Sequence, residues 1–466
     1  MKKTAKTAVF STIATIAIGA FAASSIQLSA KEEAKATDYD RALAAGYKAQ
    51  FICSGLWNGG KTLAHIKADE LTGIYPRIAK IVPMLEAEID QDGKWVRVSF
   101  DDEMQPRIAL WTSSNGCISF PIGYSAPTPK QSKNAFVRPN IDTQPWPMGD
   151  KDALAKKSRK YKRVRAIAKS AFDGKTFGKG SKTSAVVVMH NGKIIAEDYK
   201  DGHNMHTGQR TWSVAKSIAG TLIGASAATK SVKIYEPALV PEWQSYLDPR
   251  RSITLDQLMR MGSGLSSDTA GNRTDPIYMG AATVAQRATG WPLLHPSDSR
   301  FRYANNDTLL AVHATRSADK KFDPTGFFQK LGMTRTFAER DWAGNYILSS
   351  QVWTTARDMT RLGLLYLNNG MWEGKPLLPA DWRAYVSTPA GPQPKGKFGY
   401  GATFWLMNNS DGIPKDTIAA FGNRGQYLVI IPSRDLVIVR RGYDTRSTRF
   451  NLEEFTREIV KAIPSK

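Results

Sequence analysis

The sequence predicts an α/β chain in which distant segments assemble one sheet, preceded by a small mixed module. Strand-like apolar runs lie near both ends of residues 151–466, runs with helical spacing lie between them, and a proline-rich stretch precedes this region. The 466 residues are 42% hydrophobic and 23% charged. This ordinary globular composition excludes a disordered or collagen-like chain, and the length is enough for roughly two or three domains.

Residues 1–30 have the pattern of a cleaved secretory signal. Lys2, Lys3 and Lys6 give a positive start, a short apolar stretch spans residues 8–23, and a small-residue sequence ends at Ala30. An uncleaved N-terminal anchor is the alternative, although the apolar stretch is short for a membrane span. No long apolar run follows. We therefore expect an exported chain, periplasmic or secreted, with no transmembrane segment after cleavage.

The two cysteines, Cys53 and Cys117, cannot build a disulfide-rich scaffold or a four-cysteine zinc site. An exported chain meets an oxidising compartment, where a single pair of cysteines can form a bond. We therefore predict a disulfide between Cys53 and Cys117. Two buried free thiols are the alternative, since cysteine also packs as a small hydrophobic residue.

A small mixed module is predicted for residues 31–120. Residues 94–100 alternate like a half-buried strand, and residues 107–111 and 117–120 suit two further short strands. Residues 121–150 contain six prolines, a density that favours an extended connector and marks a domain boundary. Neither the module nor the connector shows recognisable catalytic chemistry, so the role of both is left open.

Residues 151–466 alternate between strand and helix patterns. Asn191-Gly192 joins two apolar runs into a predicted hairpin over residues 185–199. The other expected elements are helices over 214–229, 355–368 and 450–463 and a second hairpin over 426–440. The first of these helices is apolar nearly all round, which predicts that it is buried.

Positive charge is high, with 64 Lys+Arg against 42 Asp+Glu and a net charge of +22, which falls by three to +19 without the signal lysines. Seven basic residues lie within residues 156–165. Apolar residues from Leu154 to Phe172 have near-helical spacing, with Asp152 available as an N-cap, which puts the basic residues on the solvated face of one helix. We favour this over nucleic-acid binding and expect at most a weak attraction to anionic envelope polymers or lipid headgroups.

The sequence lacks three common motifs, for a zinc protease, for nucleotide binding and for the nucleophile of an α/β-hydrolase. The chain has no His-Glu-x-x-His, no Gly-x-x-x-x-Gly-Lys-Ser/Thr and no Gly-x-Ser-x-Gly. His203 and His206 could contribute to a zinc site, but a catalytic zinc needs three well-placed ligands, so solvated loop residues are the preferred interpretation. We predict no metal and no cofactor.

The strongest chemical pattern is Ser213-Val-Ala-Lys216 at the start of the buried helix. Residues three apart share a helix face, so the Lys216 amine can reach the Ser213 hydroxyl. Unpaired N–H groups and the helix dipole at this end can stabilise an oxyanion. Burial and the same dipole would lower the pKa of Lys216, which lets the amine act as a base near neutral pH.

The Ser-x-x-Lys spacing alone is not specific, because it recurs at Ser317 and Lys320. That second copy lies in a polar stretch and suits a solvated helix end. The alternative for Ser213 is an ordinary N-cap serine with a surface lysine. Trp212 before it and the lack of a polar helix face after it make a surface lysine unfavourable.

Tyr303 and Asn305 form a second candidate element, within Arg302-Tyr-Ala-Asn-Asn-Asp307. A tyrosine close to a serine and a lysine can relay a proton, particularly if the charge of the lysine favours the phenolate. The asparagine could brace the lysine or bind a substrate carbonyl. A turn is the alternative, since Asn-Asn-Asp is typical of turns.

Gly422 and Asn423 belong to a third candidate element, the glycine-rich segment 420–426 in front of the second hairpin. Glycines before a strand let the backbone approach a ligand closely, so an oxyanion-binding N–H could come from this segment. A flexible entry to the strand is the alternative.

The order of these elements resembles the serine β-lactamase and penicillin-recognising superfamily, most of all its class C and esterase branch. The further matching segments are residues 211–217, 261–265, 331–333, 349–358, 398–401 and 422–426. The last two segments are similar to those of 6-aminohexanoate-dimer hydrolases, which cut linear amides. The resemblance covers about residues 155–466.

The resemblance implies a central antiparallel sheet flanked by helices, with an all-helical subdomain. It also implies that Ser213 is the nucleophile, that Lys216 is the general base or proton relay, and that Tyr303 shares the proton transfers. The oxyanion would be bound by the Ser213 N–H and by an N–H near Gly422 or Asn423.

One departure from the superfamily pattern concerns its Lys-Thr-Gly box, which supplies a cation for a substrate carboxylate. His206-Thr-Gly208 is similar but precedes the nucleophile, so it cannot lie on the same strand. We therefore expect an exported serine hydrolase that acts on a small linear amide or ester. A weak β-lactamase or peptidoglycan D,D-peptidase is one alternative, and a catalytically inactive relative that binds envelope polymers is another.

Overall fold

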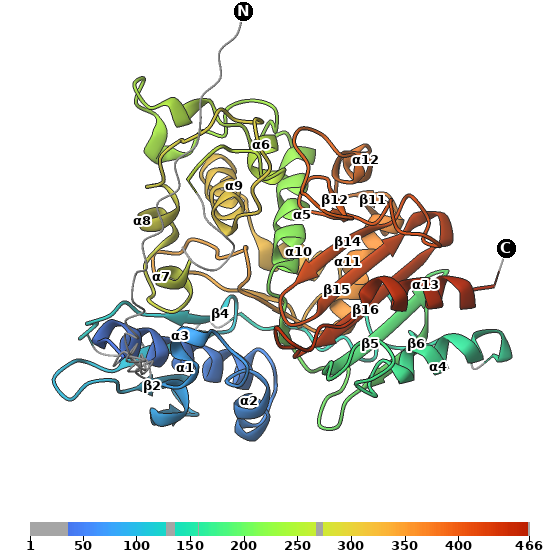
Figure 1. The fold of residues 1–466 in the computed structure, drawn as a ribbon, viewed down its shortest axis with the longest axis horizontal. Coiled ribbons are helices and arrows are strands. Elements are labelled where there is room, and N and C mark those ends of the chain that lie inside the picture. Colours follow the sequence, from blue (N-terminus) through green and yellow to red (C-terminus); the bar gives the residue numbers. More distant parts are fainter. Residues whose placement is uncertain (1–35, 127–135, 157, 267–273, 465–466) are drawn as a thin grey trace, which may run out of the picture. The chain divides into compact units, whose positions relative to one another are not determined.

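A seven-stranded antiparallel sheet forms the centre of the computed structural model, in the order β12-β13-β14-β15-β16-β5-β6 (Figure 1). Strand β16, near the C-terminus, pairs with β5, which lies more than two hundred residues earlier. The predicted assembly of one sheet from distant segments is therefore confirmed. The strands are β5 (Thr183–His190), β6 (Lys193–Tyr199), β12 (Gly399–Tyr400), β13 (Trp405–Leu406), β14 (Ile418–Gly422), β15 (Gln426–Ile431) and β16 (Leu436–Gly442).

The structure describes residues 36–126, 136–156, 158–266 and 274–464. The predicted signal at residues 1–30 and residues 127–135 of the predicted connector lie outside these ranges. The described part of the connector contains no helix. Among the described residues, none of the helices combines the length and the apolar content needed to cross a bilayer.

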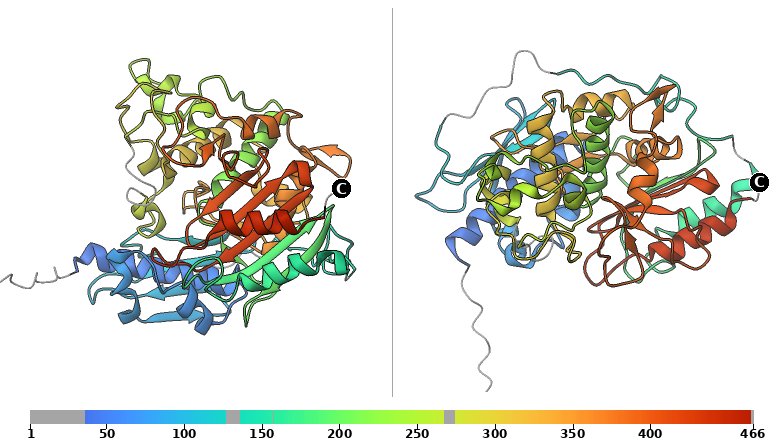
Figure 2. Two further views of the ribbon diagram at one scale, coloured as in Figure 1. Left: turned by 45° about the vertical axis from the view of Figure 1, so that its right-hand side comes forward. Right: turned by 90° about the horizontal axis from the view of Figure 1, so that it is seen from above.

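Helices pack on both faces of the sheet (Figure 2). The helices α5 (Val214–Ala228) and α11 (Ala356–Leu367) share one apolar core with Leu428 and Val437 of the sheet. The helices α4 (Lys162–Ser170) and α13 (Leu452–Ala462) share a second core with Val429 and Ile438. Successive residues of a strand point to opposite faces of the sheet. The two cores therefore explain why residues 428–431 of β15 and 436–439 of β16 are apolar without alternation. All three helices predicted by residue range, and both hairpins, are present.

The helix with the basic residues is shorter than its spacing predicted. α4 begins at Lys162, after a single 3-10 turn at Arg159–Tyr161, and Tyr161 occupies its N-cap position. Asp152 has a φ of 56° and lies outside any helix, so its predicted role as N-cap is wrong. Leu154 forms an isolated bridge with Ile194 instead, because the chain before α4 runs extended along the edge strand β6.

A mostly helical region lies between β6 and β12 in sequence. Its helix α9 packs against α5, α6 and α8, which places it beside the Ser213 helix. A small sheet, β7-β9-β8, connects this region to the start of α5. The elements are β7 (Gln209–Arg210), α6 (Leu255–Met259), α7 (Asp275–Tyr278), α8 (Val284–Ala288), α9 (Asn305–Ala318), α10 (Pro324–Lys330), β8 (Phe337–Ala338), β9 (Val352–Thr354), β10 (Met371–Trp372), β11 (Lys375–Pro376) and α12 (Trp382–Ser387).

The N-terminal module contains a four-stranded antiparallel sheet packed on a long helix, α1 (Asp38–Trp57). A disulfide joins Cys53 of α1 to Cys117 of β4, as predicted, with a Cα–Cα distance of 6.1 Å. The three predicted strands are present, whereas α1 was not predicted. The remaining elements are α2 (Leu63–Asp69), α3 (Pro76–Ala79), β1 (Ala87–Asp90), β2 (Trp95–Val98), β3 (Arg107–Thr112) and β4 (Gly116–Ser119).

Candidate active site

Ser213 lies at the junction between β7 and α5, immediately before the first residue of the helix. Strand β7 is held by its pairing with β9, and Trp212 then adopts a φ of 50°, which turns the chain into the helix. A left-handed conformation is uncommon for a tryptophan and is maintained only where the surrounding structure enforces it. The Ser213 side chain makes no capping hydrogen bond to α5. Its hydroxyl is therefore available to other partners.

Lys216 lies one turn into α5 and is 1% exposed. Its ammonium donates to Ser213 Oγ at 3.3 Å, to Asn305 Oδ1 at 2.5 Å and to the Ser349 carbonyl at 3.0 Å. All three acceptors are neutral, and together they use the three donors of the ammonium. The amine is consequently held in one position beside the serine hydroxyl, and no carboxylate of the described residues accepts a hydrogen bond from it.

Burial lowers the pKa of Lys216 to about 7, because the charged ammonium loses its hydration. The nearby Arg210 guanidinium lowers the pKa further, whereas Asp307 acts in the opposite direction. Burial in turn raises the pKa of Asp307 to about 7, which weakens the influence of that carboxyl near neutral pH. A substantial fraction of Lys216 is therefore neutral, and able to accept a proton, at physiological pH.

Tyr303 lies just before α9, between the lysine and an aromatic group formed with Tyr400 and Trp405. Its ring centroid is 5.0 Å from Lys216 Nζ, and a side-chain hydrogen bond joins it to Ser213. Burial raises the pKa of Tyr303 above its usual value. The idea that the lysine charge favours a phenolate is therefore wrong, and Tyr303 is a neutral phenol in this site.

Asn305 is the first residue of α9. Its Oδ1 accepts from Lys216, and its amide nitrogen donates to Thr274 Oγ1 at 3.2 Å. The side chain is therefore fixed at both ends. Of the two roles considered from the sequence, this geometry supports bracing of the lysine, although Asn305 also lines the adjacent cavity.

Gly422 ends β14 and lies against the chain that leads to Ser213. A Cβ atom at this position would lie 2.3 Å from the Thr211 carbonyl oxygen, so the close approach requires glycine. Asn423 follows and lines the same cavity as Ser213. The structure thus brings Ser213, Lys216, Tyr303 and Asn305 into direct contact and puts the segment of Gly422 and Asn423 beside them.

A cavity of about 480 Å³ opens beside the serine, which we name the Ser213 cavity. Residues 73–76 of the N-terminal module form one wall, and residues between Asp444 and Arg449, after β16, form another. Arg424, also in the wall, donates to the carbonyls of Asp69 and Thr72 in the module at 2.6 and 2.8 Å. The N-terminal module therefore shapes the cavity and fixes one of its cations.

The charge of the Ser213 cavity is mainly positive. Asp444 is paired with Arg440 at 2.8 Å. Arg446 and Arg449 line the cavity and form no side-chain hydrogen bond or ion pair with any described residue. These two guanidinium groups are thus available to an anionic group of a bound molecule.

Arg210 is a buried residue of the site that sequence reasoning missed. It is 1% exposed, donates to Ser350 Oγ at 2.6 Å, and its guanidinium lies 3.8 Å from the Trp212 ring centroid. The ring of Phe51, from α1, lies on the same guanidinium at 4.9 Å. No motif in the sequence marks this arginine. Its position directly before Thr211-Trp-Ser213 was the available signal.

The prediction of solvated loop histidines is correct for His206, which is exposed, and wrong for His203. His203 is 9% exposed rather than solvated, and burial lowers its pKa to about 3, because the loop packs against His65 and Tyr443. His206 forms a cluster with Asp142 and Asp150 whose ligand atoms lie within 4.8 Å of one another.

This cluster already contains cations. Arg361 and Arg357 bind Asp150 at 2.9 and 3.3 Å, and Arg335 binds Asp142 at 2.8 Å. Because guanidinium groups neutralise both carboxylates, the cluster is an ion-pair network rather than a set of free metal ligands.

The sheet, its flanking helices, the serine and lysine at the start of α5 and the tyrosine before α9 define a hydrolase of the β-lactamase fold. A sequence model of the Beta-lactamase family matches residues 169–441, more than half of the chain, and the chain belongs to this family. The predicted family and fold are therefore confirmed.

Two known hydrolases are similar to this chain. A 6-aminohexanoate-dimer hydrolase from Paenarthrobacter ureafaciens is 23% identical over 291 residues, which cover 55% of this chain and 72% of that protein. A solved structure of a candidate 6-aminohexanoate-dimer hydrolase from Bacillus anthracis aligns with a TM-score of 0.53 and 24% identity, covering 63% of this chain and 80% of that chain.

A penicillin-binding protein homologue from Caulobacter crescentus aligns with a TM-score of 0.50 and 13% identity, covering 66% of this chain and 98% of that chain. At such identities the structural likeness shows the fold alone. The activity has to be argued from the site.

Proposed function

We propose that this protein is an exported serine hydrolase that forms an acyl-enzyme on Ser213 and cleaves a linear amide or an ester. The observation that carries the proposal is the buried Lys216 amine, 3.3 Å from Ser213 Oγ, with Tyr303 hydrogen-bonded to the same serine. A hydroxyl, an amine with a lowered pKa and a neutral phenol are the groups that acyl transfer through serine requires. A relative that only binds envelope polymers has no need of all three.

In the proposed acylation, neutral Lys216 accepts the proton of Ser213 as Oγ attacks the substrate carbonyl carbon. The oxyanion is stabilised by the Ser213 N–H, at the positive end of α5, and by an N–H near Gly422 or Asn423. The Tyr303 phenol donates its proton to the leaving amine or alcohol and takes up the proton held by Lys216, so that the phenol and the neutral amine are both restored. Water then attacks the acyl ester and gives a proton to Lys216, and this proton passes to Ser213 Oγ as the acid product leaves.

The Ser213 cavity favours a substrate that carries a carboxylate. Arg446 and Arg449 provide the positive charge that the missing Lys-Thr-Gly box would otherwise supply, but from a different segment of the chain. A guanidinium binds a carboxylate strongly through paired hydrogen bonds. A 6-aminohexanoate dimer, named as the substrate of the relative from Paenarthrobacter ureafaciens, is a linear amide with a carboxylate at one end. This class of substrate fits both the proposed chemistry and the charge of the cavity.

A weak β-lactamase or D,D-peptidase is the second candidate, supported by family membership and by the penicillin-binding fold. The absence of Lys-Thr-Gly argues against efficient turnover of these substrates.

Export is proposed from two features. Residues 1–30 have the composition of a secretory signal, and the Cys53–Cys117 disulfide is consistent with an oxidising compartment such as the periplasm. Weak attraction of the basic residues near α4 to anionic envelope polymers remains part of this proposal.

Labelling of Ser213 tests the proposal directly. The folded protein is treated with a fluorophosphonate or with penicillin, and the modified peptide is identified by mass spectrometry. An adduct on Ser213 supports the acyl-enzyme, and a panel of small esters, linear amides, nitrocefin and D-amino-acid peptides then ranks the candidate substrates. No adduct with either probe would favour the inactive binding relative.

A further inference from the structure

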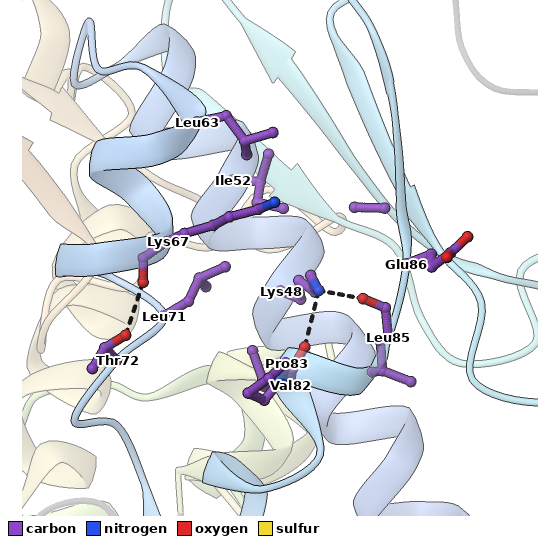
Figure 3. A pocket seen from close by; sticks show the side chains of 11 residues that line it. Lys48, Ile52, Leu63, Lys67, Leu71, Thr72, Val82, Pro83, Leu85 and Glu86 are labelled. Atoms are coloured by element: carbon purple, nitrogen blue, oxygen red, sulfur yellow. Dashed lines mark hydrogen bonds between the residues drawn. The ribbon is translucent and has the colours of Figure 1, made fainter.

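A second cavity, of about 570 Å³, lies within the N-terminal module and is separate from the proposed nucleophile (Figure 3). We name it the Lys48 cavity. Its walls come from α1, α2 and the segment between Leu71 and Ala87. Most of its lining is apolar, with Ile52, Leu71 and Val82 at 8% exposure or less. Its volume falls within the range of small-molecule sites, which are typically about 300–1,000 Å³.

Lys48 puts a positive charge at this apolar wall. The residue is 6% exposed, and its ammonium donates to the Val82 carbonyl at 2.9 Å and to the Leu85 carbonyl (Figure 3). An ammonium has three donors, so one donor remains after these two bonds. Among the described residues no carboxylate forms an ion pair with Lys48. A buried cation without a counter-ion is costly, and a bound anion would offset that cost.

A second lysine adds to the charge of the cavity. Lys67, from α2, lines the cavity and is close enough to lower the pKa of Lys48, in addition to the larger effect of burial. Glu86 is exposed in the wall and acts in the opposite direction. Two cations against one exposed anion leave the cavity positive.

We propose that the Lys48 cavity binds a monomeric aliphatic carboxylate. The carboxylate group lies on the Lys48 and Lys67 ammonium groups, and the hydrocarbon chain lies against Ile52 and the neighbouring apolar side chains. The apolar wall supplies affinity through the area it removes from water, and the paired ammonium groups select an acid over an alcohol or an amine. This site does not depend on the proposed hydrolase activity.

The Lys48 cavity and the Ser213 cavity are formed by consecutive residues of one segment. Leu71 and Thr72 line the first, and residues 73–76 line the second. Any test must therefore distinguish binding in the two cavities. Labelling of Ser213 with a fluorophosphonate blocks one of them, and variants of Lys48 and Lys67 affect only the other.

Calorimetric titration of the full chain with octanoate, octanol and octylamine tests the proposal. We expect one octanoate to bind per chain, before and after Ser213 is labelled, and octylamine not to bind. Lys48→Met keeps the length of the side chain and removes its charge, and it should weaken octanoate binding by about tenfold or more, with little effect on octanol. Lys67→Met should weaken octanoate binding less.

Lys80→Met is the matched control, since Lys80 is an exposed lysine of the same module outside this cavity, and it should leave octanoate binding unchanged. If Lys48→Met does not fold, Lys67→Met provides the test, because Lys67 is exposed and its replacement disturbs no buried contact. The proposal is overturned if octanoate does not bind, if octylamine binds equally well, if labelling of Ser213 removes binding, or if folded lysine variants bind octanoate as the wild type does.

Discussion

The two Ser-x-x-Lys sequences of this chain have the same spacing and opposite surroundings. Ser213 and Lys216 lie at the N-terminal end of α5, where the helix dipole is positive and the lysine is enclosed. Ser317 and Lys320 lie at the C-terminal end of α9. There the serine hydroxyl donates back to the His313 carbonyl, and the exposed lysine donates to the Ser317 carbonyl. The spacing alone therefore does not create a site, and burial and helix polarity make the difference.

Serine variants should separate the two copies most widely. Ser213→Ala removes the proposed nucleophile and should reduce hydrolysis of a p-nitrophenyl ester by roughly 10³-fold or more, with little loss of stability. Ser317→Ala is the matched control and should leave the rate unchanged. Steady-state kinetics and thermal unfolding of both variants provide the measurement. Activity of Ser213→Ala at a tenth of the wild-type value would refute the assignment.

Replacing the two lysines should also distinguish the two Ser-x-x-Lys sequences, with a smaller effect on the rate of hydrolysis. Lys216→Ala removes the proposed base and should lower turnover by about 10²–10⁴-fold, whereas Lys320→Ala should have no effect. The same ester assay measures both. Unchanged kinetics for Lys216→Ala would mean that another group accepts the Ser213 proton.

The sheet and the long helices were predictable because their apolar patterns are strong. Helix α1 was not, since residues from Ala42 to Gly55 are all buried and the helix therefore shows little periodicity. The N-cap predicted at Asp152 was wrong because an extended segment, rather than a helix, follows it.

The candidate site shows the same limit of sequence reasoning. Ser213, Lys216 and Tyr303 could be named because they belong to patterns of chemically active residues. Arg210 could not, because its influence on Lys216 depends on burial beneath Trp212 and Phe51, and Phe51 is contributed by the N-terminal module. The cations of the Ser213 cavity depend in the same way on how the segment after β16 packs.

The pH dependence of activity tests the lowered pKa of Lys216, a residue that is buried whereas Lys320 is exposed. With the pKa of Lys216 at about 7, kcat/KM should rise with pH and reach half its maximum near pH 7, as the amine loses its proton. Arg210→Met removes a positive charge that lowers this pKa, so the midpoint should move to higher pH. Arg210→Lys retains the charge and should keep the midpoint close to that of the wild type. A midpoint that is the same in Arg210→Met as in wild type would show that burial alone sets the pKa.

Ser213 opens into a cavity, and the cations of that cavity give the smallest expected effect. Arg446→Ala and Arg449→Ala should each raise KM for a linear amide or ester with a terminal carboxylate by roughly tenfold, because each removes a charge-assisted contact. The same variants should leave KM for a neutral ester of equal length unchanged, since neither arginine contacts Ser213, Lys216 or Tyr303 in the described structure. Equal changes for the charged and the neutral substrate would mean that the segment shapes the cavity without selecting charge. Because the comparison is made within one variant, a general loss of stability cannot imitate the expected result.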